Sequence, residues 1–166
     1  MFLEFIQDDL VIFAREFDIM APMFSFIISM LMGDIKAFYF AILMVFTGPI
    51  NGFLKDTARW FMGKKSWGIF GKGVRPTTKG FRGTYGMPSG HSQMATTFSA
   101  YWASYMMDTN YVYKYVSIGI LAALSLLVMY SRVVWERAHT VQQVIIGGLI
   151  GALIGHHFYR TVYKKY

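Results

Sequence analysis

Long apolar runs constrain the fold of this chain more than any other feature of its sequence. Ile35–Leu54 and Tyr111–Tyr130 are each about 20 residues long, which is the length that an α-helix needs to cross the hydrocarbon core of a bilayer. The composition agrees, because 55% of the 166 residues are hydrophobic and only 15% are charged, whereas about 25% are charged in soluble proteins. The sequence therefore predicts an integral membrane protein.

We expect one domain over residues 1–166, an all-α membrane bundle with about five spans and an N-terminal amphipathic helix. The spans are expected at Ile19–Met32, Ile35–Leu54, Pro88–Met107, Tyr111–Tyr130 and His139–Tyr159. Residues 1–18 combine apolar residues at helical spacing with acids on the other side, which predicts a helix lying on the membrane surface. The segment 55–87 is polar, basic and Gly-rich, and it predicts a long loop of the kind that is usually functional or disordered.

Counting membrane crossings places six polar residues at one face of the bilayer. The loop follows the Ile35–Leu54 span, and the next span starts at the same face. That span crosses the bilayer and the following one returns, so the last span also starts there. The residues gathered in this way are Lys55, Arg75, Ser89, His91, Arg132 and His139. Two histidines beside several cations are the groups needed to transfer a phosphoryl group.

The run Met87–Gln93 opens the third span and predicts an anion site. Pro88 and Ser89 stand where helix starts favour a proline and a capping hydroxyl. The free backbone N–H groups of the first turn attract an anion, and Gly90 lets a phosphate approach the backbone closely. A plain helix cap would explain Pro88 and Ser89 alone, but the addition of Gly90 and His91 favours the anion site.

His139 is the candidate nucleophile, because a neutral imidazole can attack phosphorus and form a phosphohistidine. Gln143 lies one helical turn later and can accept a hydrogen bond from the ring, which would select its tautomer. His91 could then protonate the departing oxygen. Fixed positive charge for the phosphate would come from Lys55, Arg75 and Arg132. A lone histidine at a helix end is more often a cap and a lone arginine snorkels, but their combination favours catalysis.

Patterns outside this group have ordinary explanations. Gly147, Gly151 and Gly155 predict a ridge for close helix packing within the monomer. His156 and His157 are expected at the opposite membrane interface, and the chain has no Cys, so we expect neither a metal site nor a cofactor. The net charge of +7 suits flanks that meet lipid headgroups, and no soluble basic module predicts nucleic acid binding.

These motifs resemble the phosphatidic acid phosphatase type 2 superfamily of membrane lipid phosphatases. Its signature has three blocks: Lys, six residues and Arg-Pro; then Pro-Ser-Gly-His; then Ser-Arg, five residues, His, three residues and Asp. The middle block is intact at Pro88–His91, and Tyr85–Gln93, Tyr130–Val133 and His139–Val144 are most similar to the dolichyldiphosphatase branch. The resemblance implies an all-helical bundle and metal-independent hydrolysis through a phosphohistidine.

The resemblance also implies a role for each matching residue. His139 would be the nucleophile and His91 the general acid, with Gln143 in the place of the Asp. Phosphate would be held by Lys55, Arg75, Ser89, the backbone of Gly90, and Arg132.

Two blocks depart from the signature. Gly68 stands where the first block has Lys, so Lys55 can serve only if residues are inserted before Arg-Pro, and Lys65 and Lys72 are alternatives. In the third block one extra residue precedes His139, and a helical bulge or a later start of the last span would absorb it. Gln in place of Asp is also seen in the dolichyldiphosphatase and glucose-6-phosphatase branches, so it reads as a branch marker.

The sequence thus predicts a membrane lipid phosphatase or diphosphatase, with a membrane lipid as substrate and the bilayer as its surroundings. Polyprenyl diphosphate is the leading substrate, and phosphatidate-type lipids come second. A non-catalytic lipid-binding or scaffold protein that keeps the fold is the alternative. The branch resemblance suggests an endoplasmic reticulum-like membrane. Orientation stays open, because the positive-inside rule favours a cytoplasmic site and the branch works on the lumenal side. The oligomeric state also stays open.

Overall fold

The computed structural model describes residues 2–63, 68–76 and 85–163, with side chains from residue 8 onward. The helices of this part are α1 (Phe2–Met32), α2 (Ile35–Met62), η1 (Gly68–Phe70), α3 (Gly90–Asp108), α4 (Lys114–Tyr130), η2 (Ser131–Trp135) and α5 (Val141–Tyr163). The short η1 is a 3-10 helix and η2 is a π-helix. Within the described ranges the only β pairing is an isolated bridge between Val74 and Tyr85. The prediction of an all-α bundle is confirmed.

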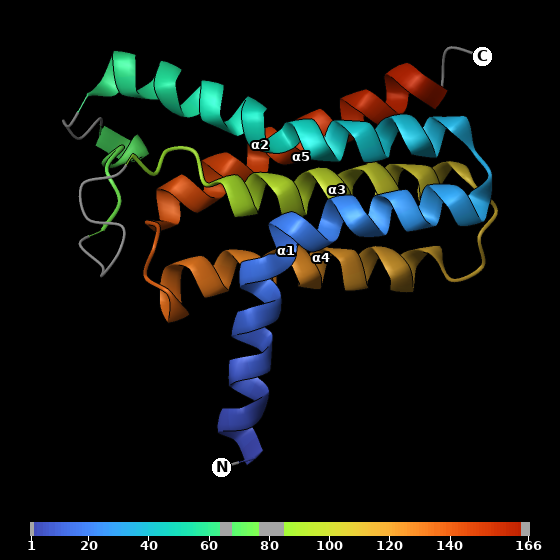
Figure 1. Ribbon diagram of the computed structural model, residues 1–166, viewed down its shortest axis with the longest axis horizontal. Helices are drawn as coiled ribbons and strands as arrows, with labels where there is room; N and C mark the ends of the chain where they lie inside the picture. The colour runs from blue at the N-terminus through green and yellow to red at the C-terminus, as the bar shows by residue number, and fades with distance from the viewer. Residues whose placement is uncertain (1, 64–67, 77–84, 164–166) are drawn as a thin grey trace.

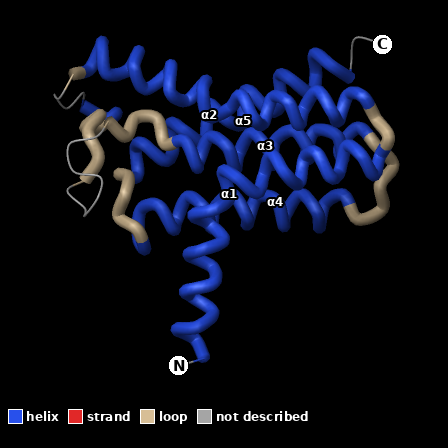
Figure 2. Tube along the Cα trace, in the orientation of Figure 1, coloured by secondary structure: helices blue, strands red, loops and turns tan. Residues whose placement is uncertain are grey.

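The helices pack around α3, which contacts α1, α2, α4 and α5. Figure 1 shows α2 to α5 and the second half of α1 running along the long axis of the molecule, while the first half of α1 projects sideways. The connections lie at the two ends of the bundle (Figure 2). Residues 68–76 and 85–89, between α2 and α3, are at one end, and the C-terminal end of α5 is at the other (Figure 1).

Three of the five predicted spans are long and apolar enough to cross a membrane: α2, residues 114–135 and α5. The central helix α3 is not among these three helices, because its mean hydropathy is lower. Its buried side carries polar residues such as Ser92, Gln93 and Thr97. These side chains face neighbouring helices, and Gln93 Oε1 accepts a hydrogen bond from Asn51 of α2, whereas residues facing lipid must be apolar. A central position therefore explains the polar composition of α3.

The glycine ridge of α5 packs directly against α3, as predicted. A Cβ atom on Gly151 would lie 2.1 Å from the carbonyl oxygen of Gln93, and one on Gly155 would lie 2.2 Å from that of Thr97. On Gly147 it would lie 2.4 Å from the carbonyl oxygen of Ser89. Only glycine permits this approach, so the ridge brings the first residues of α3 against the start of α5.

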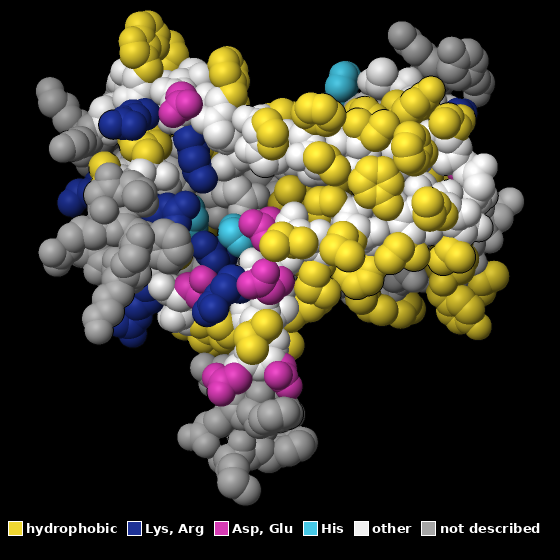
Figure 3. Space-filling view, viewed as in Figure 1, with side chains coloured by type: hydrophobic (Ala, Val, Ile, Leu, Met, Phe, Trp, Pro, Cys, Tyr) yellow, Lys and Arg dark blue, Asp and Glu magenta, His cyan; other side chains and the backbone are white. Residues whose placement is uncertain are grey.

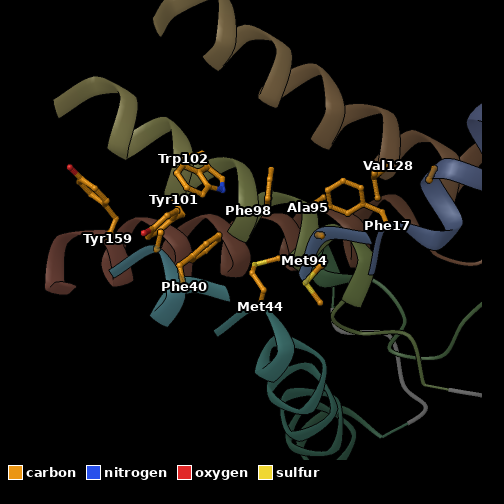
Figure 4. Packing of buried hydrophobic residues seen from close by; sticks show 13 residues of the cluster. Phe17, Phe40, Met44, Met94, Ala95, Phe98, Tyr101, Trp102, Val128 and Tyr159 are labelled. Carbon is orange, nitrogen blue, oxygen red and sulfur yellow. The ribbon is translucent and has the colours of Figure 1, made fainter. Parts of the chain in front are cut away.

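An aromatic core fills the half of the bundle where α3 ends. Figure 4 shows Phe40, Phe98, Tyr101 and Trp102 close together, and the rings of Phe40 and Tyr101 stack with centroids 3.6 Å apart. Outside this core the helices expose apolar side chains over most of the bundle (Figure 3). Such a surface suits lipid contact, and it leaves polar groups concentrated at the opposite end.

Two helix boundaries differ from those expected from sequence. The helix α2 continues to Met62 and ends at Gly63, whose φ of 55° favours glycine, so Lys55 lies on a helix and not in the loop. The surface helix and the first span are one continuous helix, α1, which changes direction along its length (Figure 1). Pro22 lies inside α1 and cannot donate to the carbonyl of Asp18, which accounts for a bend there.

Candidate active site

A cavity of about 830 Å³ opens at the end of the bundle where α3 begins. Figure 3 shows Lys, Arg, His and acidic side chains gathered in this hollow, beside the base of the projecting part of α1. One side of the cavity is lined by Arg75, His91, Arg132, Trp135 and Glu136, and the other side is lined by residues of α1. The polar end of the bundle is therefore hollow and strongly charged.

Ser89 and His91 are held at the start of α3 by contacts with α5. The N–H of Ser89 donates to the carbonyl of Gln143 over 3.0 Å, and the Ser89 side chain is fully buried. Ser89 occupies the N-cap position, as predicted, but its hydroxyl makes no capping hydrogen bond to the helix. The prediction of a capping hydroxyl is therefore wrong. Instead it accepts a hydrogen bond from Ser92 Oγ over 3.0 Å. Among the described residues, no acceptor is recorded for the hydroxyl proton of Ser89 itself.

Asn51 of α2 supports this turn from behind, and sequence reasoning assigned it no role. Its Nδ2 donates to Gln93 Oε1 over 2.8 Å and lies 3.4 Å from the carbonyl oxygen of Pro88. A Cβ atom on Gly90 would lie 2.9 Å from Asn51 Oδ1, so glycine is also needed here for packing. Asn51 precedes Lys55 by one helical turn, so the two residues lie on one face of α2. This spacing is the sequence signal that could have predicted a position for Asn51 beside the site.

The extra residue before His139 is absorbed by the π-helix η2 and by a later start of α5 at Val141, as expected. The N–H groups of Ala138 and His139 both donate to the carbonyl of Arg132, over 2.9 and 3.1 Å. The buried Arg132 side chain in turn donates from Nη1 to Glu136 Oε2 over 2.6 Å. The backbone of His139 is therefore anchored directly to Arg132.

Gln143 selects the tautomer of His139. Its Nε2 donates to the carbonyls of Lys72 and Val74 over 2.8 and 3.1 Å, which places Oε1 on the opposite side of the amide. Oε1 lies 3.0 Å from His139 Nδ1 and can only accept. The Nδ1 atom therefore carries the proton, and His139 Nε2 keeps a lone pair. Burial, followed by the charges of Arg75 and Arg132, lowers the pKa of His139 to about 3, so its imidazole is neutral at neutral pH.

The same amide holds the segment that carries Arg75. A Cβ atom on Gly86 would lie 2.4 Å from Gln143 Oε1 and 2.7 Å from Arg75 Cγ, so Gly86 leaves room for both side chains. The N–H of Gly86 donates to the carbonyl of Gly73 over 2.8 Å, and Tyr85 Oη donates to the carbonyl of Ala58 in α2 over 3.0 Å. Segments on both sides of the undescribed part of the loop are thus tied to the bundle.

Three cations surround His139. Lys55 interacts electrostatically with Arg75 and Arg132, and all three act on the imidazole of His139. Lys72, an alternative to Lys55, is exposed and contributes its carbonyl. Lys65, the other alternative, lies outside the described residues. The structure thus brings together positive charge from α2, the loop and η2 around one neutral histidine.

The histidines near the other end of α5 are separate from this site. His156 Nδ1 lies 2.9 Å from Ser104 Oγ in the second half of α3. Among the described residues no group of three or more His, Asp or Glu side chains is placed to hold a metal ion.

Comparison with known sequences now identifies the family. The sequence pattern of the PAP2 superfamily matches residues 36–166. The chain belongs to the PAP2 superfamily. It is similar to the dolichyldiphosphatase of Saccharomyces cerevisiae, with 37% identity over 86 residues that cover 49% of this chain and 35% of that protein. It is also similar to dolichyldiphosphatase 1 of Callithrix jacchus, with 42% identity over 81 residues that cover 42% of this chain and 33% of that protein.

The PAP2 assignment confirms the family resemblance, including its dolichyldiphosphatase-like branch. The matches span about a third of the length of these relatives. No solved structure matches the chain. The PAP2 pattern begins at Lys36, so α1 lies outside it although α1 lines one side of the cavity.

Proposed function

We propose that this PAP2 protein is a membrane lipid phosphatase that hydrolyses a lipid diphosphate to the monophosphate and phosphate. The observation that carries the proposal is the pairing of His139 Nδ1 with Gln143 Oε1, beside Lys55, Arg75 and Arg132. It leaves a neutral nitrogen with a lone pair among three cations, which is what attack on an anionic phosphorus requires. The names of the similar dolichyldiphosphatases favour a polyprenyl diphosphate as substrate.

In the first step His139 Nε2 attacks the terminal phosphorus. A nitrogen–phosphorus bond forms, and the bond from phosphorus to the bridging oxygen breaks. The electron pair leaves with the lipid monophosphate, and His91 gives its proton to that oxygen. Gln143 Oε1 accepts the Nδ1–H throughout, which stabilises the positive charge that develops on the ring.

In the second step a water molecule attacks the phosphohistidine. His91, now neutral, accepts a proton from this water, and the bond between His139 Nε2 and phosphorus breaks. Inorganic phosphate leaves, and both histidines return to their starting forms. Every proton in this cycle is transferred by a side chain of the protein, and we therefore expect turnover without a metal ion.

The phosphate oxygens would be bound by groups from three blocks. Arg75 and Arg132 offer planar guanidinium forks, and Lys55 adds a point charge. The free hydroxyl proton of Ser89 and the N–H groups at the first turn of α3, around Gly90, complete a cradle for an anion. This charge is suited to a diphosphate as well as to a single phosphate.

We further propose five membrane spans within one domain, formed by the second half of α1 and by α2, α3, α4 with η2, and α5. The first half of α1 would lie along the membrane surface, because it leaves the bundle sideways (Figure 1). The active-site face would then meet the headgroup region. The resemblance to the dolichyldiphosphatase branch makes an endoplasmic reticulum-like membrane the expected location.

The test is phosphate release by detergent-purified protein in excess EDTA. We expect release from polyprenyl diphosphate to persist in EDTA and to disappear in the His139→Ala variant. Faster phosphate release from phosphatidate than from polyprenyl diphosphate would instead indicate a phosphatidate-type phosphatase. No release from either lipid by folded protein would refute the enzymatic proposal and favour a lipid-binding or scaffold protein.

A further inference from the structure

The helix α1 contacts His91 although it lies outside the PAP2 pattern. His91 Nε2 is 3.0 Å from the carbonyl oxygen of Arg15 and 3.6 Å from Asp18 Oδ2. Arg15 and Asp18 are three residues apart on α1, so both oxygens come from one helical turn. One nitrogen of His91 is therefore directed at α1.

The contact with Arg15 determines which nitrogen can deliver a proton. A backbone carbonyl only accepts hydrogen bonds, so His91 Nε2 must carry a hydrogen to make this contact. The proton that His91 transfers must then leave from Nδ1. If His91 is the proton donor, the ring is an imidazolium before transfer, with Nε2–H pointing at α1 and Nδ1–H as the donor to the leaving oxygen.

The charges around His91 oppose this imidazolium. Burial disfavours the charged ring most, the charge of Arg132 of η2 adds to this, and Arg75 lines the same cavity. Like charges within a few ångströms disfavour the protonated ring. The groups that favour it are Asp18 of α1, the backbone carbonyl of Arg15 in the same helix, and Glu136 next to η2. Glu136, however, is already bound to Arg132 Nη1 over 2.6 Å. Asp18 is the carboxylate that lies beside the His91 ring itself, with Oδ2 at 3.6 Å from Nε2.

We propose that Asp18 is a positioning residue for His91, one that holds the Nε2–H end of the ring and stabilises its protonated form. The helix α1 thereby completes the active site, and proton delivery to the leaving group depends on a segment outside the PAP2 pattern. This inference rests on the proposed function, because it assumes that His91 is the proton donor.

A second contact keeps α1 in place beside the site. Arg15 Nε lies 4.0 Å from Glu136 Oε2, the same oxygen that accepts from Arg132. The row Arg15, Glu136 and Arg132 therefore links α1 to η2 across the cavity, next to the contact between Asp18 and His91. Removing the Asp18 charge leaves this link intact, so α1 should stay where it is.

The test compares Asp18→Asn with Glu16→Gln, which makes the same charge change on a neighbouring cavity-lining residue. Both variants, full length and in detergent, are assayed on a polyprenyl diphosphate and on p-nitrophenyl phosphate. The nitrophenolate leaves without a proton, so its release does not need the general acid. We expect Asp18→Asn to lose about tenfold in kcat on the lipid diphosphate with little change in KM, and to keep its rate of nitrophenolate release in the first turnover of p-nitrophenyl phosphate, before His91 acts as a base.

The pH profile supplies a further readout. The rate on the diphosphate falls as His91 loses its proton, and removal of the Asp18 charge should move this alkaline limb about one pH unit lower. Asp18→Glu should restore it, and Glu16→Gln should leave it in place. Equal losses on both substrates, or an unmoved alkaline limb, would overturn the proposal. Failure of the proposed function is separate, because the unmodified protein would then release no phosphate, or His139→Ala would retain activity on both substrates.

Discussion

Replacing Gln143 by Glu tests how the site is assembled, because the change keeps the shape of the side chain and removes its donors. Gln143 is fully buried, and its Nε2 faces three carbonyl oxygens, those of Lys72, Gly73 and Val74, at 2.8 to 3.4 Å. A carboxylate would place a second oxygen against these acceptors. Oε1 would still be able to accept from His139.

The magnitude follows from the two shorter hydrogen bonds. A buried acceptor left without its donor costs about 1–3 kcal/mol, so losing the bonds to Lys72 and Val74 costs about 2–6 kcal/mol. A protonated Glu would recover one of them and reduce the cost to about 1–3 kcal/mol. The freed segment also carries Arg75, and loss of one group that stabilises the transition state costs about 10²- to 10³-fold in kcat.

The assay pairs Gln143→Glu with Gln142→Glu, an adjacent change on an exposed residue. Thermal unfolding in detergent and kcat on a polyprenyl diphosphate are measured for both variants. We expect Gln143→Glu to lose at least about 1 kcal/mol of unfolding free energy and about 100-fold in kcat, and Gln142→Glu to change stability by less than about 0.5 kcal/mol. Equal behaviour of the two variants would refute the argument that the amide donors hold the loop.

Three other outcomes follow from the geometry. Gly151→Ala puts a Cβ atom 2.1 Å from the carbonyl of Gln93 and should destabilise the protein by about 1–3 kcal/mol; Gly119→Ala, which meets open space in α4, should gain about 0.5–1 kcal/mol in the same detergent melt. In ¹⁵N NMR, His139 should keep the signature of a neutral Nδ1–H ring from pH 8 to about pH 5, because its pKa is about 3; titration near pH 6.5 would contradict this. Asn51→Ala should cost about 1–3 kcal/mol in thermal unfolding by leaving Gln93 Oε1 without its donor, and an unchanged melt would count against that role.

Regular patterns in the sequence carried much of the prediction. Apolar runs of membrane length indicated the helices, and the four-residue spacing of glycines in α5 indicated its packing face. The i to i+4 spacing of His139 and Gln143 predicted their hydrogen bond. The glycine spacing was accessible because a helix repeats every 3.6 residues, so residues four apart lie on one face. His139 precedes α5, and its contact with Gln143 depends on the turn that begins this helix. The sequence of α3 predicts a membrane span less clearly, because this helix is polar. Its central position in the bundle, and not its own composition, makes it stable.

The sequence by itself therefore determined the class of fold, the family and the residues that carry the phosphatase signature. Only the tertiary structure decided how η2 absorbs the extra residue before His139, which carbonyls engage the amide of Gln143, and which nitrogen of His91 faces α1. Arg15 and His91 are 76 residues apart in sequence, and no local periodicity relates them. Their contact depends on how α1 bends and packs against α3, and that is a property of the whole bundle.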